Sequence, residues 1–206
     1  MKRLHVLALA LTVAVAGLAL FTFSAVARDE RERNVRASLN GFNEVVGPGS
    51  ISTAGTGSFR ATVDESGQMI TYTLTYTLDD EVSPTGQLGA GAVPTATQAH
   101  IHFAERHVGG GIIAFLCNVS GTVPPAAHTP PACPLHGGTV TGTITPQDII
   151  GPTGQGIEPG HFAEAVRAIR AGAVYANVHS TRWPAGEIRG QLGNRQDNDR
   201  GEEEDD

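Results

Sequence analysis

The segment Ala99-His100-Ile101-His102-Phe103 alternates apolar and polar residues, and the interpretation of the whole chain starts from it. Such alternation predicts a β-strand with one buried face. Successive side chains of a strand point to opposite faces, so His100 and His102 share one face and the apolar residues share the other. We therefore expect the apolar face to pack into a core, and two imidazoles to be presented together on an outward face.

A second run with the same pattern is Val174-Tyr175-Ala176-Asn177-Val178-His179. Its valines and alanine are expected to be buried, while Tyr175, Asn177 and His179 face outward. If this strand lies beside the first, a third histidine joins the first two. Whether the three histidines meet is a geometric question that the sequence leaves open.

Several further runs alternate in the same way, and turns rich in glycine or proline separate them. The clearest covers 70–78, where large apolar residues alternate with threonines, which is typical of an antiparallel sheet with one face in water. A helical period is found at 160–171. Other strands are expected at 38–41, 57–63, 112–116, 139–145 and 186–192. This pattern predicts an all-β fold, an antiparallel Greek-key or immunoglobulin-like β-sandwich with one short helix.

The two ends of the chain differ from its middle. Lys2 and Arg3 precede an apolar segment, and small residues follow it at 25–27, which predicts a cleaved signal peptide over 1–27. An uncleaved membrane anchor is the competing interpretation. We expect, in order along the rest of the chain, a flexible charged leader over 28–36, one domain over 37–194 and a disordered acidic tail over 195–206.

The charge of the chain limits its partners. The formal net charge is −7, and removal of the signal peptide would make it more negative because Lys2 and Arg3 would be lost. Phosphate binding depends on a concentrated basic surface, so a nucleic acid partner is not expected. A secreted, periplasmic or cell-surface protein is expected, with no membrane span after cleavage. A soluble protein and a component of the cell envelope both remain candidate partners, and the oligomeric state stays open.

The chain has two cysteines, Cys117 and Cys133. In an exported protein such a pair is expected to form a disulfide. Metal-binding thiolates are the alternative, but a closely spaced pair of cysteines is missing.

Several motifs together resemble the CHRD (chordin-type) domain over about 37–193. The motifs, in family order, are Ser38-Leu39-Asn40-Gly41, Asn43-Glu44-Val45, Ala99-His100-Ile101-His102, the run 172–179 (GAVYANVH) and the run 186–192 (GEIRGQL). The resemblance implies an extracellular β-sandwich module, found in animal chordins, which bind growth factors, and in bacterial exported proteins. The chain departs from the family after Val45, where a Val-Gly-Pro run replaces the usual Pro-Pro, and in a longer segment between the cysteines.

A metal site is one interpretation of the histidines. Imidazole is a good ligand for copper and zinc, and His100 and His102 can reach one ion if His179 approaches as the third ligand. Copper is the first choice and zinc the second. Three ligands would leave an open position, as in reactive metal sites. The alternative is that all three histidines only form hydrogen bonds. The arrangement is also similar to that of copper-zinc superoxide dismutase, although the chain lacks the His and Asp cluster of a second zinc site.

Four further residues are candidates for supporting the histidines. Tyr175 and Asn177 are expected on the same face as His179. Glu187 and Arg189 share a face of the last strand, where they could orient the histidines, bind an anion or form a structural ion pair. No catalytic residue and no organic cofactor site is predicted. The sequence thus indicates an exported, non-catalytic binding or envelope module that could carry a metal, with a copper-dependent redox protein as the alternative.

Overall fold

The computed structural model describes residues 34–47, 49–78, 94–119 and 129–193. The predicted signal peptide and acidic tail lie outside these residues. The predicted leader, 28–36, overlaps the described residues at 34–36, and the predicted boundary between leader and domain needs a correction. Strand β1 (Asn34–Asn40) begins inside it, because Val35 is buried in the core and orders the residues on either side. Among the described residues, none of the helices is long and apolar enough to cross a membrane.

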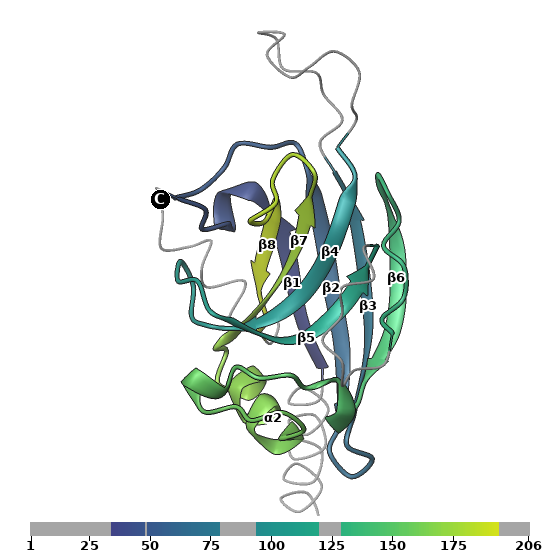
Figure 1. Ribbon diagram of the computed structural model, residues 1–206, viewed down its shortest axis with the longest axis vertical. Helices are drawn as coiled ribbons and strands as arrows, with labels where there is room; N and C mark the ends of the chain where they lie inside the picture. Colours follow the sequence, from purple (N-terminus) through teal and green to yellow (C-terminus); the bar gives the residue numbers. More distant parts are fainter. Residues whose placement is uncertain (1–33, 48, 79–93, 120–128, 194–206) are drawn as a thin grey trace, which may run out of the picture. The chain divides into compact units, whose positions relative to one another are not determined.

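The chain folds into one antiparallel eight-stranded sheet with the order β5-β4-β7-β8-β1-β2-β3-β6 (Figure 1). Four of the pairs join strands that follow each other in the sequence, while β4–β7, β8–β1 and β3–β6 bring together strands that are distant in sequence. The strands after β1 are β2 (Thr56–Asp64), β3 (Met69–Thr77), β4 (Ala96–Phe103), β5 (Gly111–Asn118), β6 (Gly137–Ile144), β7 (Val174–Ser180) and β8 (Ile188–Gln191). The all-β prediction is confirmed, and the finer Greek-key or sandwich arrangement stays a prediction.

The period-two pattern of β3 appears directly in its burial. Ile70, Tyr72, Leu74 and Tyr76 are buried, and the threonines between them are exposed. Neighbouring β2 and β6 also turn threonines and other polar residues outward, so this wall of the sheet has one face in water and one in the core. Burial of apolar area at about 25 cal/mol per Å² is the main stabilising contribution of such a face.

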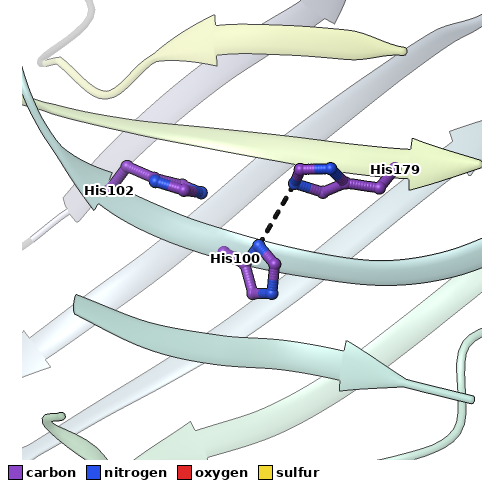
Figure 2. Close-up of side chains that lie close together, drawn as sticks. All are labelled: His100, His102 and His179. Carbon is purple, nitrogen blue, oxygen red and sulfur yellow. Dashed lines mark hydrogen bonds between the residues drawn. The ribbon is translucent and has the colours of Figure 1, made fainter. Parts of the chain in front are cut away.

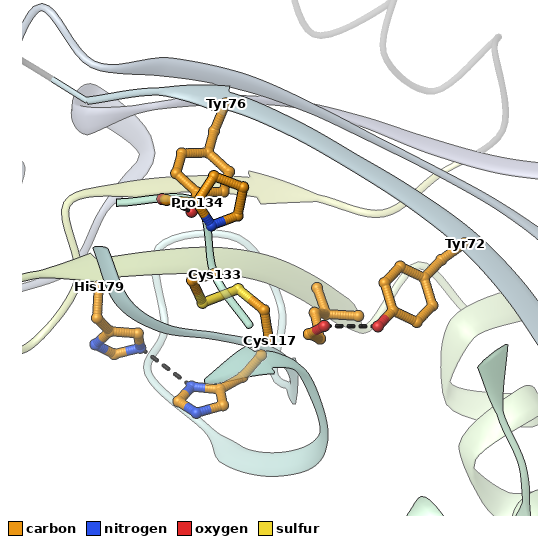
Figure 3. The surroundings of a disulfide bond; sticks show 8 residues. Tyr72, Tyr76, Cys117, Cys133, Pro134 and His179 are labelled. Atoms are coloured by element: carbon orange, nitrogen blue, oxygen red, sulfur yellow. Dashed lines mark hydrogen bonds between the residues drawn. A yellow bond between two sulfur atoms is a disulfide. The ribbon is translucent and has the colours of Figure 1, made fainter. Parts of the chain in front are cut away.

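The two edge strands, β5 and β6, contact each other across the core, so the sheet curls round it. Tyr72 and Tyr76 on β3 donate hydrogen bonds to the carbonyls of Leu116 and Pro134, at 2.6 and 2.5 Å. The predicted disulfide between Cys117 and Cys133 is confirmed, and it ties β5 to the segment that leads into β6 (Figure 3). Side-chain hydrogen bonds and one covalent link therefore hold the curled sheet together.

One α-helix, α2 (Phe162–Arg170), lies within the predicted helical segment. Its apolar residues Phe162, Ala165, Val166 and Ile169 join the core. Gly172 follows with a φ of 69°, a left-handed conformation that glycine adopts without strain and that ends the helix. Three short 3-10 helices complete the described secondary structure: η1 (Gly41–Asn43), η2 (Pro146–Asp148) and η3 (Thr153–Gln155).

Candidate metal centre

Pairing between β4 and β7 brings the three histidines to one face. His100 lies opposite Asn177, His102 opposite Tyr175, and Gln98 opposite His179. His179 therefore lies diagonally across from His100, two residues after Asn177 on the neighbouring strand. Strand side chains alternate, so all of these residues point away from the apolar core.

The histidine rings converge (Figure 2). His100 Nδ1 lies 3.2 Å from His179 Nε2. One ring nitrogen from each of the three histidines lies within 4.8 Å of the other two. Among the described residues this is the group of histidine, cysteine and acidic side chains that is close enough to share a metal ion.

The expectation that these histidines face outward into solvent is wrong. Only 1% of His100 and 7% each of His102 and His179 is exposed. Loops cover this face of β4 and β7: the carbonyl of Gly110 contacts His102, and that of Pro184 contacts His179. From the β5 side, the ring of Phe115 packs edge-on against His100, with 4.4 Å between centroids. The strand pattern identified the face correctly, but the loops that bury it carry no periodic signal.

Hydrogen bonds to the backbone orient two of the rings. His102 Nδ1 lies 2.9 Å from the Gly110 carbonyl, and His179 Nδ1 lies 3.0 Å from the Pro184 carbonyl. A carbonyl only accepts, so both Nδ1 atoms carry the proton and both Nε2 atoms keep a lone pair. Metal-binding histidines are commonly fixed in this way by a backbone carbonyl.

The third ring completes the arrangement. His179 Nε2 has a lone pair, so His100 Nδ1 donates the hydrogen bond between them. In the described part of the chain, Nε2 of His102 is buried without a hydrogen-bond partner. A buried polar atom left unpaired costs roughly 1–3 kcal/mol, so this cluster is not explained as a set of structural hydrogen bonds alone.

Burial keeps the three imidazoles neutral. It lowers the pKa of His100 to about 2, with the charges of His179 and His102 adding to the effect. Burial also lowers the pKa of His102 to about 4, partly opposed by its bond to Gly110. The pKa of His179 is lowered for the same reason, against its bond to Pro184. A metal ion binds the neutral imidazole, so little proton competition is left at neutral pH.

Tyr175 and Arg189 form a stack beside the histidines. The Tyr175 ring is parallel to His102 within 3°, with 4.7 Å between centroids. The guanidinium carbon of Arg189 lies 3.4 Å from the centre of the Tyr175 ring. Arg189 also donates to the Glu105 carbonyl at 2.8 Å, and it is 2% exposed. Its positive charge contributes to the lowered pKa of His102.

The polar surroundings of the histidine centre also include Asn177, Glu187 and Glu44. Asn177 is buried between Tyr175 and His179 on β7. Glu187 Oε1 accepts a hydrogen bond from Thr53 at 2.9 Å, which holds Thr53 next to the start of β8. Glu44 is buried, and burial raises the pKa of its carboxyl while the nearby charge of Arg189 lowers it. Burial lowers the pKa of Arg189, and the nearby Tyr175 and Glu44 oppose this effect. The sequence interpretation did not assign Glu44 to the site.

Three contributors were missed for different reasons. Gln191 lies opposite Tyr175 and donates to the carbonyls of Ala104 and Gly172. It follows Glu187 and Arg189 at the next alternate position of the last strand, so the same period-two count could have found it. Glu44 lies inside one of the quoted motifs but outside any strand, and Phe115 belongs to an apolar run without alternation. Only the fold brings Phe115 to His100, and Glu44 to Asn177 and Arg189.

Comparison with known proteins gives one match. A family model described as the CHRD domain matches residues 35–192. The chain belongs to the CHRD domain family. Neither the curated proteins nor the solved structures contain a match to this chain.

The CHRD match covers the whole histidine centre. It includes β1, which pairs with β8 next to Arg189, as well as β4, β7 and the loops that bury the rings. The site is therefore built from the CHRD domain itself and not from a segment added to it. The disulfide fits a CHRD domain in an oxidising compartment.

Proposed function

We propose that this protein is an exported, non-catalytic CHRD module that binds one copper ion through His100, His102 and His179. The observation that supports this most directly is the convergence of three neutral ring nitrogens in a buried, pre-oriented cluster. Zinc is the second choice of metal.

The spacing of the nitrogens suits a shared ion. Histidine nitrogens about 2.0–2.1 Å from an ion and 3.2 Å apart subtend an angle of about 100° at it. Two nitrogens on one ion at these bond lengths lie about 3.4–3.6 Å apart at angles of about 109–120°, so a pair at the 4.8 Å limit would have to close by about 1.2–1.4 Å when the ion binds. Binding needs His100 to carry its proton on Nε2, which a neutral imidazole does by changing tautomer.

Charge favours a monovalent ion. The three ligands are neutral, and Arg189 adds a positive charge behind Tyr175. A buried ion of charge +2 would cost more desolvation energy here than one of charge +1. Imidazole nitrogen suits copper well, so cuprous ion with three histidine ligands satisfies both demands.

A second candidate function is a copper-dependent redox protein, distantly similar to superoxide dismutase. What favours it is the three-ligand set, which leaves a position open for water or substrate, as in catalytic metal sites. Similarity of arrangement does not by itself establish activity.

The finer fold prediction also stays a proposal. We propose that the curled sheet has Greek-key topology, supported by the β4–β7 pairing after a long connection and by the contact between β5 and β6.

For localisation, we propose a secreted, periplasmic or cell-surface protein, supported by the disulfide and the family. Its proposed partner is a soluble protein or an envelope component, not a nucleic acid.

Metal analysis of protein purified without a histidine tag tests the main proposal. The full chain is loaded with cuprous or zinc ion in separate experiments, dialysed and analysed by elemental mass spectrometry. We expect one copper per chain, lost in His102→Gln and His179→Gln and retained in His161→Gln, which removes an exposed histidine. Equal metal content in wild type and the two site variants would refute the proposal.

A superoxide assay and a peroxide assay of the copper-loaded protein then separate the two candidate functions. Turnover that disappears in His179→Gln would favour the redox protein. A loaded but inactive protein would favour the binding module.

A further inference from the structure

Asn177 lies in the middle of the face that carries the histidines. On β7 it is between Tyr175 and His179, and in the sheet it is directly opposite His100 on β4. Alternate residues of one strand and directly paired residues of neighbouring strands share a face and lie close together. The Asn177 side chain is 2% exposed, so it is enclosed together with the three rings.

The orientation of the Asn177 amide follows from its neighbours on two sides. Asn177 Nδ2 lies on the side of Gly186, and so does the carboxylate of Glu44, because a Cβ on Gly186 would meet both groups. Burial raises the pKa of Glu44 and lowers the pKa of His102, and the Asn177 side chain opposes both shifts. A donor has this effect on a carboxyl group, and an acceptor has it on an imidazole. Nδ2 therefore faces Glu44, and Oδ1 faces the ring of His102.

This orientation places His102 between two acceptors. Its Nδ1 donates to the carbonyl of Gly110 at 2.9 Å, and a neutral imidazole has only one proton to donate. Nε2 of His102 and Oδ1 of Asn177 are both buried, and neither has a hydrogen-bond partner among the residues that the structure describes. Two lone pairs thus lie in the same enclosed space, and a cation is the species that both can bind.

Arg189 does not supply the missing donor for Oδ1. It lies opposite Asn177 on β8, but its guanidinium extends over the ring of Tyr175 and donates to the carbonyl of Glu105 at 2.8 Å. A buried amide oxygen without a hydrogen bond is unfavourable. An ion next to Oδ1 would remove this cost.

We propose that Asn177 Oδ1 is a fourth, weak ligand of the ion held by His100, His102 and His179. This inference rests on the proposed function. Amide oxygens serve as weak axial ligands in some trigonal copper sites, and a neutral amide adds no charge to the site. Structural metal sites are closed by protein ligands, whereas catalytic sites keep a position for water or substrate. A fourth protein ligand therefore favours the binding module over the redox protein.

Carbon monoxide tests whether the fourth position is occupied. It is a small neutral ligand that binds cuprous ion at an open coordination position, and infrared spectroscopy detects its stretching band when it is bound. Full-length wild type and Asn177→Ala are loaded with cuprous ion under anaerobic conditions and titrated with carbon monoxide. We expect at least about tenfold tighter binding to Asn177→Ala, because in wild type the gas must displace Oδ1, and a factor of ten corresponds to about 1.4 kcal/mol.

Copper affinity is measured on the same samples by competition with a cuprous chelator. Because Asn177 is buried and Asn177→Ala could misfold, Asn177→Leu, which is similar in size but has no oxygen, is the second variant. Both should bind cuprous ion about tenfold more weakly than wild type. Asn177→Asp keeps an oxygen in place and should exclude carbon monoxide as wild type does. Asn34→Ala, which removes an exposed amide on β1, is the matched control and should behave like wild type.

The outcomes separate this inference from the proposed function. Equal carbon monoxide binding by wild type and Asn177→Ala, whether tight or absent in both, would overturn the fourth ligand and leave the histidine site in place. Unchanged copper affinity in Asn177→Leu would overturn it as well. A wild-type chain that binds no copper would instead refute the proposed function, and the fourth ligand with it.

Discussion

Tyr175 has two roles at the scale of single residues, because its ring lies against a candidate ligand and a buried cation. The ring limits the tilt of His102 and replaces part of the hydration that Arg189 loses on burial. Stacking and cation–π contacts of this kind contribute about 0.5–2 kcal/mol each when desolvated. The hydroxyl is less important, since the hydrogen bond that it accepts from the Gly110 N–H is 3.4 Å long.

Replacement of the ring should therefore destabilise the protein more than removal of the hydroxyl. We expect Tyr175→Leu to lower the free energy of unfolding by about 2–3 kcal/mol, through loss of both contacts and partial exposure of Arg189. Urea denaturation measures this change. Tyr175→Phe is the control and should change stability by less than about 1 kcal/mol. Similar losses in the two variants would mean that the hydroxyl, and not the ring, is the stabilising group.

Gly186 is required by its own backbone and by its neighbours. Its φ is 133°, and a Cβ at this position would contact the carboxylate of Glu44 and lie 3.2 Å from Asn177 Nδ2. Gly47 also has a left-handed φ, of 63°, but an added Cβ there would meet no atom within 4 Å.

This pair gives a matched experiment. Gly186→Ala should lower the free energy of unfolding by about 2–4 kcal/mol, since backbone strain and a displaced buried carboxylate add together. Gly47→Ala should cost only about 1 kcal/mol, from the strain alone. Thermal or urea unfolding of both variants decides the matter, and equal losses would show that Glu44 moves aside freely.

At the scale of elements, closure of the sheet depends on the contacts between its two edge strands. Cys117 pairs with Ala99 of β4, next to His100, so the disulfide anchors the part of β5 that borders the histidine strand. The bridged cysteines are 16 residues apart. Cross-linking a loop of this length stabilises a fold by about 3 kcal/mol in the loop-entropy description.

Removal of the disulfide should therefore weaken the fold without abolishing the sheet. We expect the double variant Cys117→Ser, Cys133→Ser to lose about 3 kcal/mol of unfolding free energy in guanidinium titration. Wild-type protein measured with reductant is the control and should show a comparable loss. An unchanged midpoint in both would show that hydrogen bonds alone hold the edges together.

The tyrosines on β3 add a pH dependence. Burial raises the pKa of Tyr76 to about 12 from an ordinary value of 10.0. Burial, with the charge of Asp148, also raises the pKa of Tyr72. Above pH 10 the unfolded chain loses these protons while the folded protein keeps them, so stability falls as pH rises. Below pH 10 both states keep the protons and the contribution is constant.

Alkaline titration tests this sign. The free energy of unfolding should fall between pH 10 and about 12, by at most about 1.4 kcal/mol per pH unit for each tyrosine. Tyrosinate absorbance should rise together with unfolding, not before it. Tyr76→Phe should reduce the slope. A stability independent of pH in this range would contradict the burial of these hydroxyls.

At the scale of the whole molecule, the sequence predicts the elements better than the site. Period-two patterns are local, so the strand at 99–103, the threonine-rich strand and the helix could all be placed from residues alone. The approach of His179 to His100 could not, because it depends on the register between strands whose histidines are 79 residues apart. Burial of the histidines could not be predicted either, since the loops over them are selected by the fold and not by any repeated pattern.

The exposed threonine wall of β2, β3 and β6 has a consequence for how this protein can diverge. Thr71, Thr73 and Thr75 contribute no side chain to the core, whereas the residues between them are among the most buried in the chain. Evolution can therefore alter alternate positions along one strand almost independently. Related proteins should vary most on this wall and keep the opposite one, where β4, β7 and β8 are filled on both faces. For an engineer, the same wall is the place to attach a label or a surface anchor without disturbing the histidines.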